Sequence, residues 1–455
     1  MLNFLIEYLA ILMFVALAAG LFTGFPVAFL LGGIAVVFGT LGWMAGVFSP
    51  IEFFNFVPRV WSGSADNIIL VAVPCFIYMG VMLDRSGVAL KLLNTLQYYM
   101  RAVPGGLALA VTILATILAA TTGIIGASVT MMALLALPPM LKRGYQTELA
   151  VGTIAASSCL GILIPPSIML VIMADMMSIS VGKLFMGALL PGLILSALYM
   201  VYVVGISFLR PGVAPATQTL NDVSGKPPAR DVVIGFLAPL ALILMVLGSI
   251  FGGLATPTEA SAIGAFGATV LAFLNGMLDK KSFADAVDRT AVTVGMIFGI
   301  IIGATAFSYV FRSLGGEHLI VEAIGAFEYG PWPILVALML AIFLLGFFFD
   351  WLEITLIILP IFSVVIKNLD FGGHVQSGYN LYWFAILVAV NLQTSFLSPP
   401  FGYSLFYLKA VAPEGVRTAH IYRGIIPFIV LQLIGLTLIT VFPALVTWLP
   451  SLMSR

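Results

Sequence analysis

The chain has 455 residues, of which 62% are hydrophobic and only 8% are charged, whereas soluble globular domains carry roughly 25% charged residues. The 19 basic residues balance the 19 acidic ones, so the basic excess typical of nucleic-acid-binding proteins is absent and no nucleic-acid partner is expected. The composition therefore excludes a sizeable soluble domain and predicts an all-α, polytopic protein in a lipid bilayer.

Eight apolar runs have the length of ordinary membrane-spanning helices. The first is interpreted as an uncleaved span, because no Lys or Arg precedes Arg59 and a secretory signal needs a basic region before its apolar core. Two charged, amphipathic segments, 84–101 and 279–289, are expected to lie along the membrane interface. The eight runs are 4–22, 25–46, 67–83, 184–209, 232–252, 259–278, 290–311 and 424–449.

Two further apolar runs, 148–177 and 381–411, each contain a Pro-Pro pair. The first run includes GILIPPS at 161–167, and the second includes SFLSPPF at 395–401. Proline lacks an amide hydrogen and blocks the helical hydrogen bond before it, which frees carbonyl oxygens. Both runs are therefore predicted to be broken helices.

Two other apolar stretches, 104–141 and 331–367, are interrupted near their middles by TTGIIGAS at 121–128 and LLGFFFD at 344–350. The halves are short for a complete crossing, which needs about 20 residues. Each stretch is therefore predicted to be a re-entrant hairpin that enters and leaves on one side. A full double crossing stays open as the alternative, because it would place the following loops on the same sides.

Basic residues in short loops are retained on the cytoplasmic side of a membrane. Ten crossings and two re-entrant hairpins place 14 Lys and Arg residues on one side and 5 on the other. This asymmetry predicts that both termini lie outside the cytoplasm. The residues on the predicted outer side are Arg59, Lys183, Arg312, Lys367 and Arg455.

An internal repeat links the two halves of the chain. A shift of 222 residues lays 127–138 over 349–360 and aligns Ser128 with Asp350, and a shift of 234 residues aligns the two Pro-Pro pairs. Five predicted crossings precede the polar linker 211–230 and five follow it, and an odd number inverts the second unit. The sequence thus predicts an inverted-topology repeat, which many secondary transporters share.

Non-helical backbone is tolerated within a membrane only inside protein or beside a polar cavity. We therefore expect the hairpin tips and broken helices to build a cavity whose free carbonyls and hydroxyls suit a hard monovalent cation, with half-helix N-termini facing an anionic substrate group. The predicted first site places the loop Thr122–Ser128 against Gly161–Pro166 with Ser157 and Ser158 nearby, and the second places Gly346–Asp350 against Thr394–Pro400 with Asn391 and Gln393 nearby.

Each of these residues has a simpler interpretation. Ser and Gly also permit close helix packing, Asp350 and Glu353 could cap a helix or pair between helices, and Asp175 is expected at the membrane interface. The aromatic clusters Phe347–Phe349 and Tyr403–Tyr407 are more typical of lipid or helix contacts than of substrate binding. The histidines show no metal-binding spacing and are expected to be solvent-exposed loop residues: His318, His374 and His420.

Three motifs resemble one family over essentially the whole chain. They are LLALPPMLKRGYQTELAVGTIAASSCLGILIPPSIMLVI at 134–172, ATPTEASAIGA at 255–265 and NLQTSFLSPPFGYSLFYLKAVAP at 391–413. Together they resemble the large membrane subunit of tripartite ATP-independent periplasmic (TRAP) transporters, in particular the branch labelled mannitol/chloroaromatic compound transport.

The resemblance implies a sodium-driven, elevator-type importer of small organic acids in the bacterial inner membrane, with periplasmic termini and no organic cofactor. Expected partners are a small four-helix membrane subunit, here a separate polypeptide, and a periplasmic substrate-binding protein. The hairpins and broken helices would form a moving transport domain. The implied division is scaffold and interfacial arm in 1–103, transport domain in 104–183, scaffold in 184–330, transport domain in 331–412, and the last span in 413–455.

The family's ion sites use a hairpin tip and the adjacent unwound helix. Many relatives have Ser-Gly-Ser at the first tip, where this chain has Ile125-Gly126-Ala127, so hydroxyl ligands there would have to come from Thr122 or Ser128. The expected first sodium site is Thr122, Ile125, Ala127, Ser128, Gly161, Ile164 and Pro166, the second is Gly346, Asp350, Thr394, Ser395, Ser398 and Pro400, and the expected substrate contacts are Ser157, Ser158, Asn391 and Gln393.

The sequence supports the alternatives to this function to different degrees. A stand-alone sodium/dicarboxylate symporter or an exporter of similar architecture is the close one. An intramembrane enzyme is disfavoured, because an aspartyl protease needs two facing aspartates and a serine nucleophile needs a neighbouring base within the membrane. The chain is therefore not expected to be an enzyme.

Overall fold

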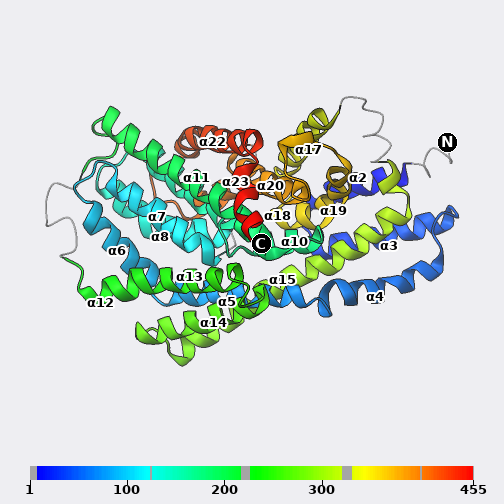
Figure 1. The fold of residues 1–455 in the computed structure, drawn as a ribbon, viewed down its shortest axis with the longest axis horizontal. Coiled ribbons are helices and arrows are strands. Elements are labelled where there is room, and N and C mark those ends of the chain that lie inside the picture. The colour runs from blue at the N-terminus through cyan, green and yellow to red at the C-terminus, as the bar shows by residue number, and fades with distance from the viewer. Residues whose placement is uncertain (1–7, 123–124, 217–225, 320–329, 400–401, 454–455) are drawn as a thin grey trace.

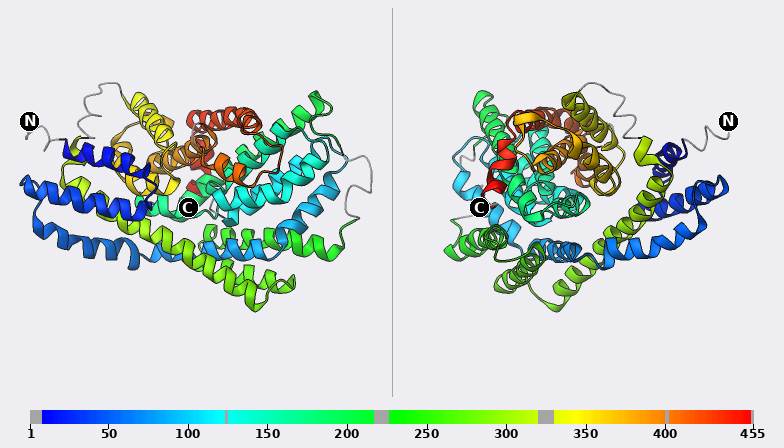
Figure 2. Two further views of the ribbon diagram at one scale, coloured as in Figure 1. Left: turned by 180° about the vertical axis from the view of Figure 1, so that it is seen from behind. Right: turned by 45° about the vertical axis from the view of Figure 1, so that its right-hand side comes forward.

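The computed structural model describes residues 8–122, 125–216, 226–319, 330–399 and 402–453. Within these ranges the chain forms helices and their connections and no strand. Ten helical stretches of the described chain are long and apolar enough to cross a membrane. The molecule is elongated, with α2, α3 and α4 forming an arm at one end (Figure 1, Figure 2). The predicted all-α, polytopic fold is confirmed.

The N-terminal part begins with α2 (Leu9–Leu21), which has 13 residues and is shorter than the expected first span, whose start lies outside the described residues. Between the predicted spans 25–46 and 67–83, the chain forms short 3-10, α and π helices, which join this end of the molecule to the rest. The elements up to the first hairpin are α3 (Val27–Met44), η1 (Pro50–Asn55), α4 (Phe56–Val60), η2 (Trp61–Ala65), η3 (Ile68–Val71), α5 (Ala72–Arg85) and α6 (Val88–Met100).

Two packed helices and then a broken helix occupy the segments predicted for the first hairpin and the first broken helix. Helices α7 (Gly106–Thr122) and α8 (Ile125–Lys142) pack against each other. They are followed by α9 (Thr147–Cys159), a short turn η4 (Leu160–Ile162) and α10 (Ile168–Met176). The helix is interrupted at the Pro-Pro pair, where the Pro165–Pro166 peptide bond is cis.

The middle of the chain contains α11 (Val181–Leu209), α12 (Ala229–Val232), η6 (Val233–Leu237), α13 (Ala238–Phe251), α14 (Pro257–Leu274) and α15 (Lys280–Ser313). With 29 and 34 residues, α11 and α15 are the longest of the described helices. The segment 279–289 does not form an arm separate from the following span, because the 34-residue helix α15 runs through it without interruption. Its predicted location at the membrane interface stays a prediction. Asp279 starts this helix by accepting a hydrogen bond from the Ser282 amide at 2.6 Å, and the Ser282 hydrogen bonds lower the pKa of Asp279.

The second half repeats the order of hairpin and broken helix. The hairpin comprises α17 (Pro331–Leu345), then α18 (Trp351–Glu353), η7 (Ile354–Ile358) and α19 (Leu359–Asn368), with the break at 346–350 as predicted. After the turn η8 (Gly372–His374), the second broken helix comprises α20 (Asn380–Leu397) and α21 (Tyr403–Val411). The single span predicted at 424–449 is instead α22 (Thr418–Val441) and α23 (Ala444–Leu452), separated at Phe442–Pro443.

The first parts of both broken helices, α9 and α20, lie in the protein core. Every residue of α9 from Leu149 to Cys159 is buried, and α20 is buried from Trp383 to Leu397. Helices that are apolar all round belong in a protein interior or a membrane span. α9 and α22 approach closely, since a Cβ added at Gly152 would lie 2.1 Å from the Gly424 carbonyl oxygen.

The prediction that the three histidines lie in loops is wrong. His318 and His420 lie in helical segments, and His374 ends the turn η8 and is half-buried. Its Nε2 lies 2.8 Å from the Thr440 carbonyl oxygen, and its ring centre lies 4.8 Å from that of Trp332. His374 therefore joins η8 to α22 and α17, a long-range contact that sequence spacing does not show.

Candidate functional site

The first hairpin tip lies against the break in the first broken helix. The turn η4 packs against both α7 and α8. Within the break, Ser167 Oγ donates a hydrogen bond to the Ile162 carbonyl at 2.7 Å. Thr122 ends α7, but its side chain lies outside the described part of the structure. Ala127 is exposed, and the other predicted ligands are buried: Ile125, Ser128, Gly161, Ile164 and Pro166.

The same tip contacts the second repeat. A Cβ added at Gly126 would lie 2.6 Å from Cζ of Tyr407, and α8 packs against α21. Ser404, also on α21, donates a long hydrogen bond of 3.4 Å to the Ala155 carbonyl on α9. The modules of the two repeats therefore meet directly, as their predicted shared cavity requires.

The second hairpin tip is tied to the second broken helix by side-chain hydrogen bonds. Ser395 Oγ donates to the Phe343 carbonyl at 3.0 Å, and Asn391 Nδ2 donates to the Met339 carbonyl at 2.7 Å. Gly346 makes this approach possible, because an added Cβ would lie 2.6 Å from the Ser395 Cβ. The end of α17 therefore contacts α20 at Asn391 and Ser395, and the ion site predicted from Gly346–Asp350 and Thr394–Pro400 stays a prediction. Pro400 lies outside the described residues.

Aromatic residues at this tip serve mainly in packing. The Tyr403 hydroxyl donates to the Phe348 carbonyl at 3.1 Å, and its ring packs edge-on against Phe396. Phe347 packs in the same way against Phe343. These contacts agree with the interpretation of both aromatic clusters as helix contacts.

Two carboxylates begin the second arm of this hairpin. Asp350 is the N-cap of α18 and accepts a hydrogen bond from the Trp351 amide at 2.8 Å, so its capping role is real. Glu353 is only 5% exposed, and its Oε2 atom is buried without a hydrogen-bond partner. A buried, unpaired carboxylate oxygen is costly, so it marks a place where a ligand, ion or water is expected.

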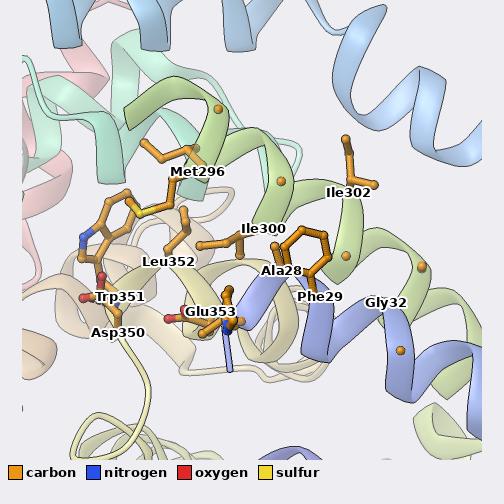
Figure 3. Close-up of a pocket in the computed structure, with 18 residues that line it drawn as sticks. Ala28, Phe29, Gly32, Met296, Ile300, Ile302, Asp350, Trp351, Leu352 and Glu353 are labelled. Carbon is orange, nitrogen blue, oxygen red and sulfur yellow. Dashed lines mark hydrogen bonds between the residues drawn. The ribbon is translucent and has the colours of Figure 1, made fainter. Parts of the chain in front are cut away.

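Both carboxylates line a cavity of about 770 Å³ between this hairpin and helices α3 and α15. The rest of the lining is almost wholly apolar, and Figure 3 shows Leu352 and Glu353 facing the two helices. Gly295, Gly299 and Gly303 recur every fourth residue along the α15 wall. The residues labelled on the opposite walls include Ala28, Phe29, Gly32, Met296 and Ile300.

Sequence analysis missed this cavity, because its far walls come from segments predicted to be ordinary spans. The only available signals were the Gly32-Gly33 pair and the regular glycine spacing on α15. Glycine permits a close approach there, since a Cβ at Gly303 would lie 2.5 Å from the Ala28 carbonyl oxygen. Such spacing is also typical of simple helix packing in membranes, so it did not point to a cavity by itself.

The predicted substrate residues fall into two groups. Asn391 is engaged with the hairpin, as described above, and Ser157 Oγ lies 3.4 Å from the Thr112 hydroxyl. In contrast, the Ser158 hydroxyl and both amide atoms of Gln393 are buried without a hydrogen-bond partner. Their helices, α9 and α20, pack against each other. Gln393 and Ser158 thus keep unused hydrogen-bonding capacity in the core where the two repeats meet.

Asp175 lies at the end of α10 and accepts a hydrogen bond from Asn67 Nδ2 at 2.8 Å. Asn67 also caps η3 by accepting from the Ile69 amide. Asp175 therefore connects the first broken helix to the chain before α5, and its predicted position near the membrane interface stays a prediction.

Comparison with known families gives a match along nearly the whole chain. Residues 14–445 match the model of the tripartite ATP-independent periplasmic transporter, DctM component. Three similar relatives carry transporter names. The first is the isethionate TRAP transporter permease protein DctMQ of Oleidesulfovibrio alaskensis, which is 29% identical over 86% of this chain, and the chain spans only 59% of that relative.

The second is the C4-dicarboxylate TRAP transporter large permease protein DctM of Pseudomonas aeruginosa, 28% identical over 89% of this chain and 91% of its own length. The third is the ectoine/5-hydroxyectoine TRAP transporter large permease protein UehC of Ruegeria pomeroyi, 30% identical over 82% of this chain and 83% of its own length.

Among solved structures, the YdaH transporter of Alcanivorax borkumensis has a similar fold, with a TM-score of 0.62 over 86% of this chain and 87% of that one at 12% identity. This likeness concerns the fold alone. The family match and the helices described above lead to one conclusion. The chain belongs to the family of DctM components of tripartite ATP-independent periplasmic transporters, which are multi-pass membrane permease subunits and not enzymes.

Proposed function

We propose that this chain is the large permease subunit of a secondary transporter that imports a small organic acid together with sodium ions. The observation that carries the proposal is the pair Asp350 and Glu353, which line a cavity of about 770 Å³ from the tip of the second hairpin. Ionisable residues within a membrane protein usually mark an ion or substrate pathway.

Sodium is the proposed coupling ion because of the oxygen atoms near this tip. The hydroxyls of Thr394, Ser395 and Ser398 each donate their hydrogen to a main-chain carbonyl. A hydroxyl that donates in this way keeps its lone pairs for a cation. Hard cations prefer such oxygen ligands, and the Asp350 carboxylate adds negative charge. The corresponding proposal for the first tip uses main-chain carbonyls, because Ile125 and Ala127 have no side-chain oxygen.

The proposed substrate class follows from the relatives. Their names refer to isethionate, to C4-dicarboxylates and to ectoine, and each of these compounds has an acidic group. The buried, unpaired Gln393 amide and Ser158 hydroxyl are the proposed polar contacts in the core. Both can donate hydrogen bonds to a carboxylate.

The proposed partners are a small four-helix membrane subunit and a periplasmic substrate-binding protein. The DctMQ relative extends well beyond the matched region, and we infer that its additional part corresponds to the small subunit. In the proposed elevator movement, residues 104–183 and 331–412 move against the remaining helices, and the termini are periplasmic.

The test is uptake into proteoliposomes that contain the purified complex with its small subunit and binding protein. An inward sodium gradient should drive accumulation of a radiolabelled acid identified by its binding to the binding protein. Replacement of sodium by potassium should abolish accumulation. Unchanged uptake after the sodium gradient has collapsed would refute sodium coupling.

The alternative is a stand-alone sodium/dicarboxylate symporter or an exporter. Affinity purification of the tagged large subunit separates the two ideas. A stand-alone carrier would purify alone and transport without additions, whereas the proposed complex should bring down a small membrane subunit and need the binding protein for uptake.

A further inference from the structure

A second, smaller cavity of about 240 Å³ lies at the C-terminal end of α15. Its lining contains two arginines, Arg59 of α4 and Arg312 of α15, together with Ser308. Neither arginine lines the larger cavity beside Asp350 and Glu353. Two guanidinium groups at one small cavity repel each other, and an anion between them would relieve this repulsion.

Arg59 is held on a fixed platform. Its guanidinium carbon lies 4.5 Å from the centre of the Tyr309 ring. The Tyr309 hydroxyl donates to Glu52 at 3.3 Å and accepts from Asn55 Nδ2 at 3.0 Å. Stacking on an aromatic face leaves the in-plane N–H donors of an arginine free for other partners. Among the described residues, no carboxylate forms an ion pair with Arg59.

Arg312 lies one helical turn after Tyr309, on the same side of α15. Its ion pair with Glu317 is long, with Nε 3.8 Å from Oε2, and both side chains are substantially exposed. Such a pair is weak, so Arg312 retains donors for a stronger acceptor. The Oγ atom of Ser308, which lines the same cavity, is buried without a hydrogen-bond partner.

The cavity also joins two parts of the molecule. Arg59, Ser308 and Arg312 belong to the predicted scaffold, whereas Met176 and Pro360 on the facing walls belong to the predicted transport part. Both arginines lie on the side that the distribution of basic residues predicts to be outside the cytoplasm. An anion bound here would therefore sit at the outer entrance, between the parts that are proposed to move.

We infer that this cavity is an outer binding subsite for the carboxylate of the transported acid, in which Arg59 and Arg312 supply charge-assisted hydrogen bonds and Ser308 supplies a hydroxyl. Charge-assisted bonds from guanidinium to carboxylate are strong and directional. The volume of about 240 Å³ is below the roughly 300 Å³ at which drug-sized ligand pockets begin. It therefore suits a small acid or the acidic end of a larger one. The identity of the ligand rests on the proposed function.

The first test does not depend on transport. Phenylglyoxal modifies accessible guanidinium groups, and mass spectrometry of the purified complex of large and small subunits would give the rate at Arg59 and Arg312. Succinate at twice its Kd should slow both reactions about threefold, because the unoccupied fraction falls by a factor of one plus the ratio of the acid concentration to Kd. Dimethyl succinate, the neutral analogue, should not slow them, and the exposed Arg210 should react equally throughout. The inference would be overturned if succinate and dimethyl succinate protected the arginines equally or if neither protected them. It would also be overturned if only the binding protein, without any acid, slowed the labelling.

The second test uses variants in the reconstituted system. Arg59→Gln and Arg312→Gln should each raise the KM for the acid by at least about tenfold, because each removes charge-assisted hydrogen bonds, with little change in kcat. Glu317→Gln is the matched control, since it breaks the same ion pair as Arg312→Gln but leaves both cations. It should leave KM unchanged or lower it. If Glu317→Gln reproduces the Arg312→Gln defect, the arginine only stabilises the helix end and the subsite is wrong.

The failure of this inference is distinguishable from failure of the proposed function. Absence of sodium-driven uptake by the unmodified complex would refute the proposed function, whereas the labelling pattern would still report whether Arg59 and Arg312 bind a carboxylate. Normal sodium-driven uptake without protection of either arginine would refute the subsite alone.

Discussion

Replacement of Gly346 by alanine tests whether the second hairpin tip is packed directly on the second broken helix. The added Cβ would lie 2.6 Å from the Ser395 Cβ and 2.7 Å from its Oγ. Carbon atoms in favourable contact are about 3.5–4.0 Å apart, so the tip and α20 must separate by about 1 Å. The backbone of Gly346 has φ of −64°, which alanine adopts without strain, and the effect is therefore steric.

Overpacking of this kind costs about 1–3 kcal/mol. Displacement of Ser395 would also weaken its hydrogen bond to the Phe343 carbonyl, which contributes about 1 kcal/mol. We therefore expect Gly346→Ala to lower the free energy of unfolding by about 2–4 kcal/mol. Gly373→Ala is the control, because no atom lies within 4 Å of the added Cβ. It should change stability by less than about 0.5 kcal/mol.

The assay is unfolding of the purified protein in detergent, followed by intrinsic fluorescence, for the two single variants Gly346→Ala and Ser395→Gly and for the double variant. Ser395→Gly removes the clashing atoms, so the double variant should be more stable than additivity of the single variants predicts. Full additivity, or a Gly346→Ala protein as stable as the parent, would show that the tip and α20 are not in contact at this point.

Three further predictions concern other parts of the molecule. Glu353→Gln should preserve folding, because shape is kept, but should lower uptake in proteoliposomes by at least about tenfold by removing a charge from the cavity, and normal uptake would exclude Glu353 from the transport path. Trp383→Phe should lower the free energy of unfolding by about 1–3 kcal/mol, because the indole N–H donates to the buried Ile439 carbonyl at 2.9 Å and its loss leaves that carbonyl unpaired. Asp285→Asn removes exposed ion pairs with both Arg85 and Arg289. Because an exposed pair contributes about 0–1 kcal/mol, the total loss should stay below about 2 kcal/mol, and a larger loss in denaturant unfolding would show that the pairs are more shielded than their exposure indicates.

The helices and their interruptions were largely predictable, because local chemistry decides them. A Pro-Pro pair cannot continue a helix in any surroundings, and both predicted breaks are present. The breaks in the two hairpins, within 121–128 and 344–350, likewise coincide with polar and glycine-containing segments of apolar runs. Whether the hairpins are re-entrant is not decided by these local rules and stays a prediction.

Predictions failed where continuity or long-range contact decides the outcome. The polarity of segment 279–289 predicts that it is separate from the following span. Because the segment contains no helix-breaking residue, α15 continues through it. Local sequence predicts His374 in an exposed loop, but its contacts are with Trp332 and Thr440, which are distant in sequence.

The amino-acid sequence by itself determined that this chain spans a membrane and that an apolar hairpin is followed by a proline-broken helix in each half, because hydrophobicity and backbone chemistry act over a few residues. Only the tertiary structure decided which polar groups in those segments have hydrogen-bond partners. It bonds Ser395 and Asn391 to the hairpin, leaves Gln393 and one oxygen of Glu353 buried and unpaired, and places Arg59 and Arg312 at one cavity. These outcomes depend on the packing of helices that lie far apart along the chain, which no local pattern encodes.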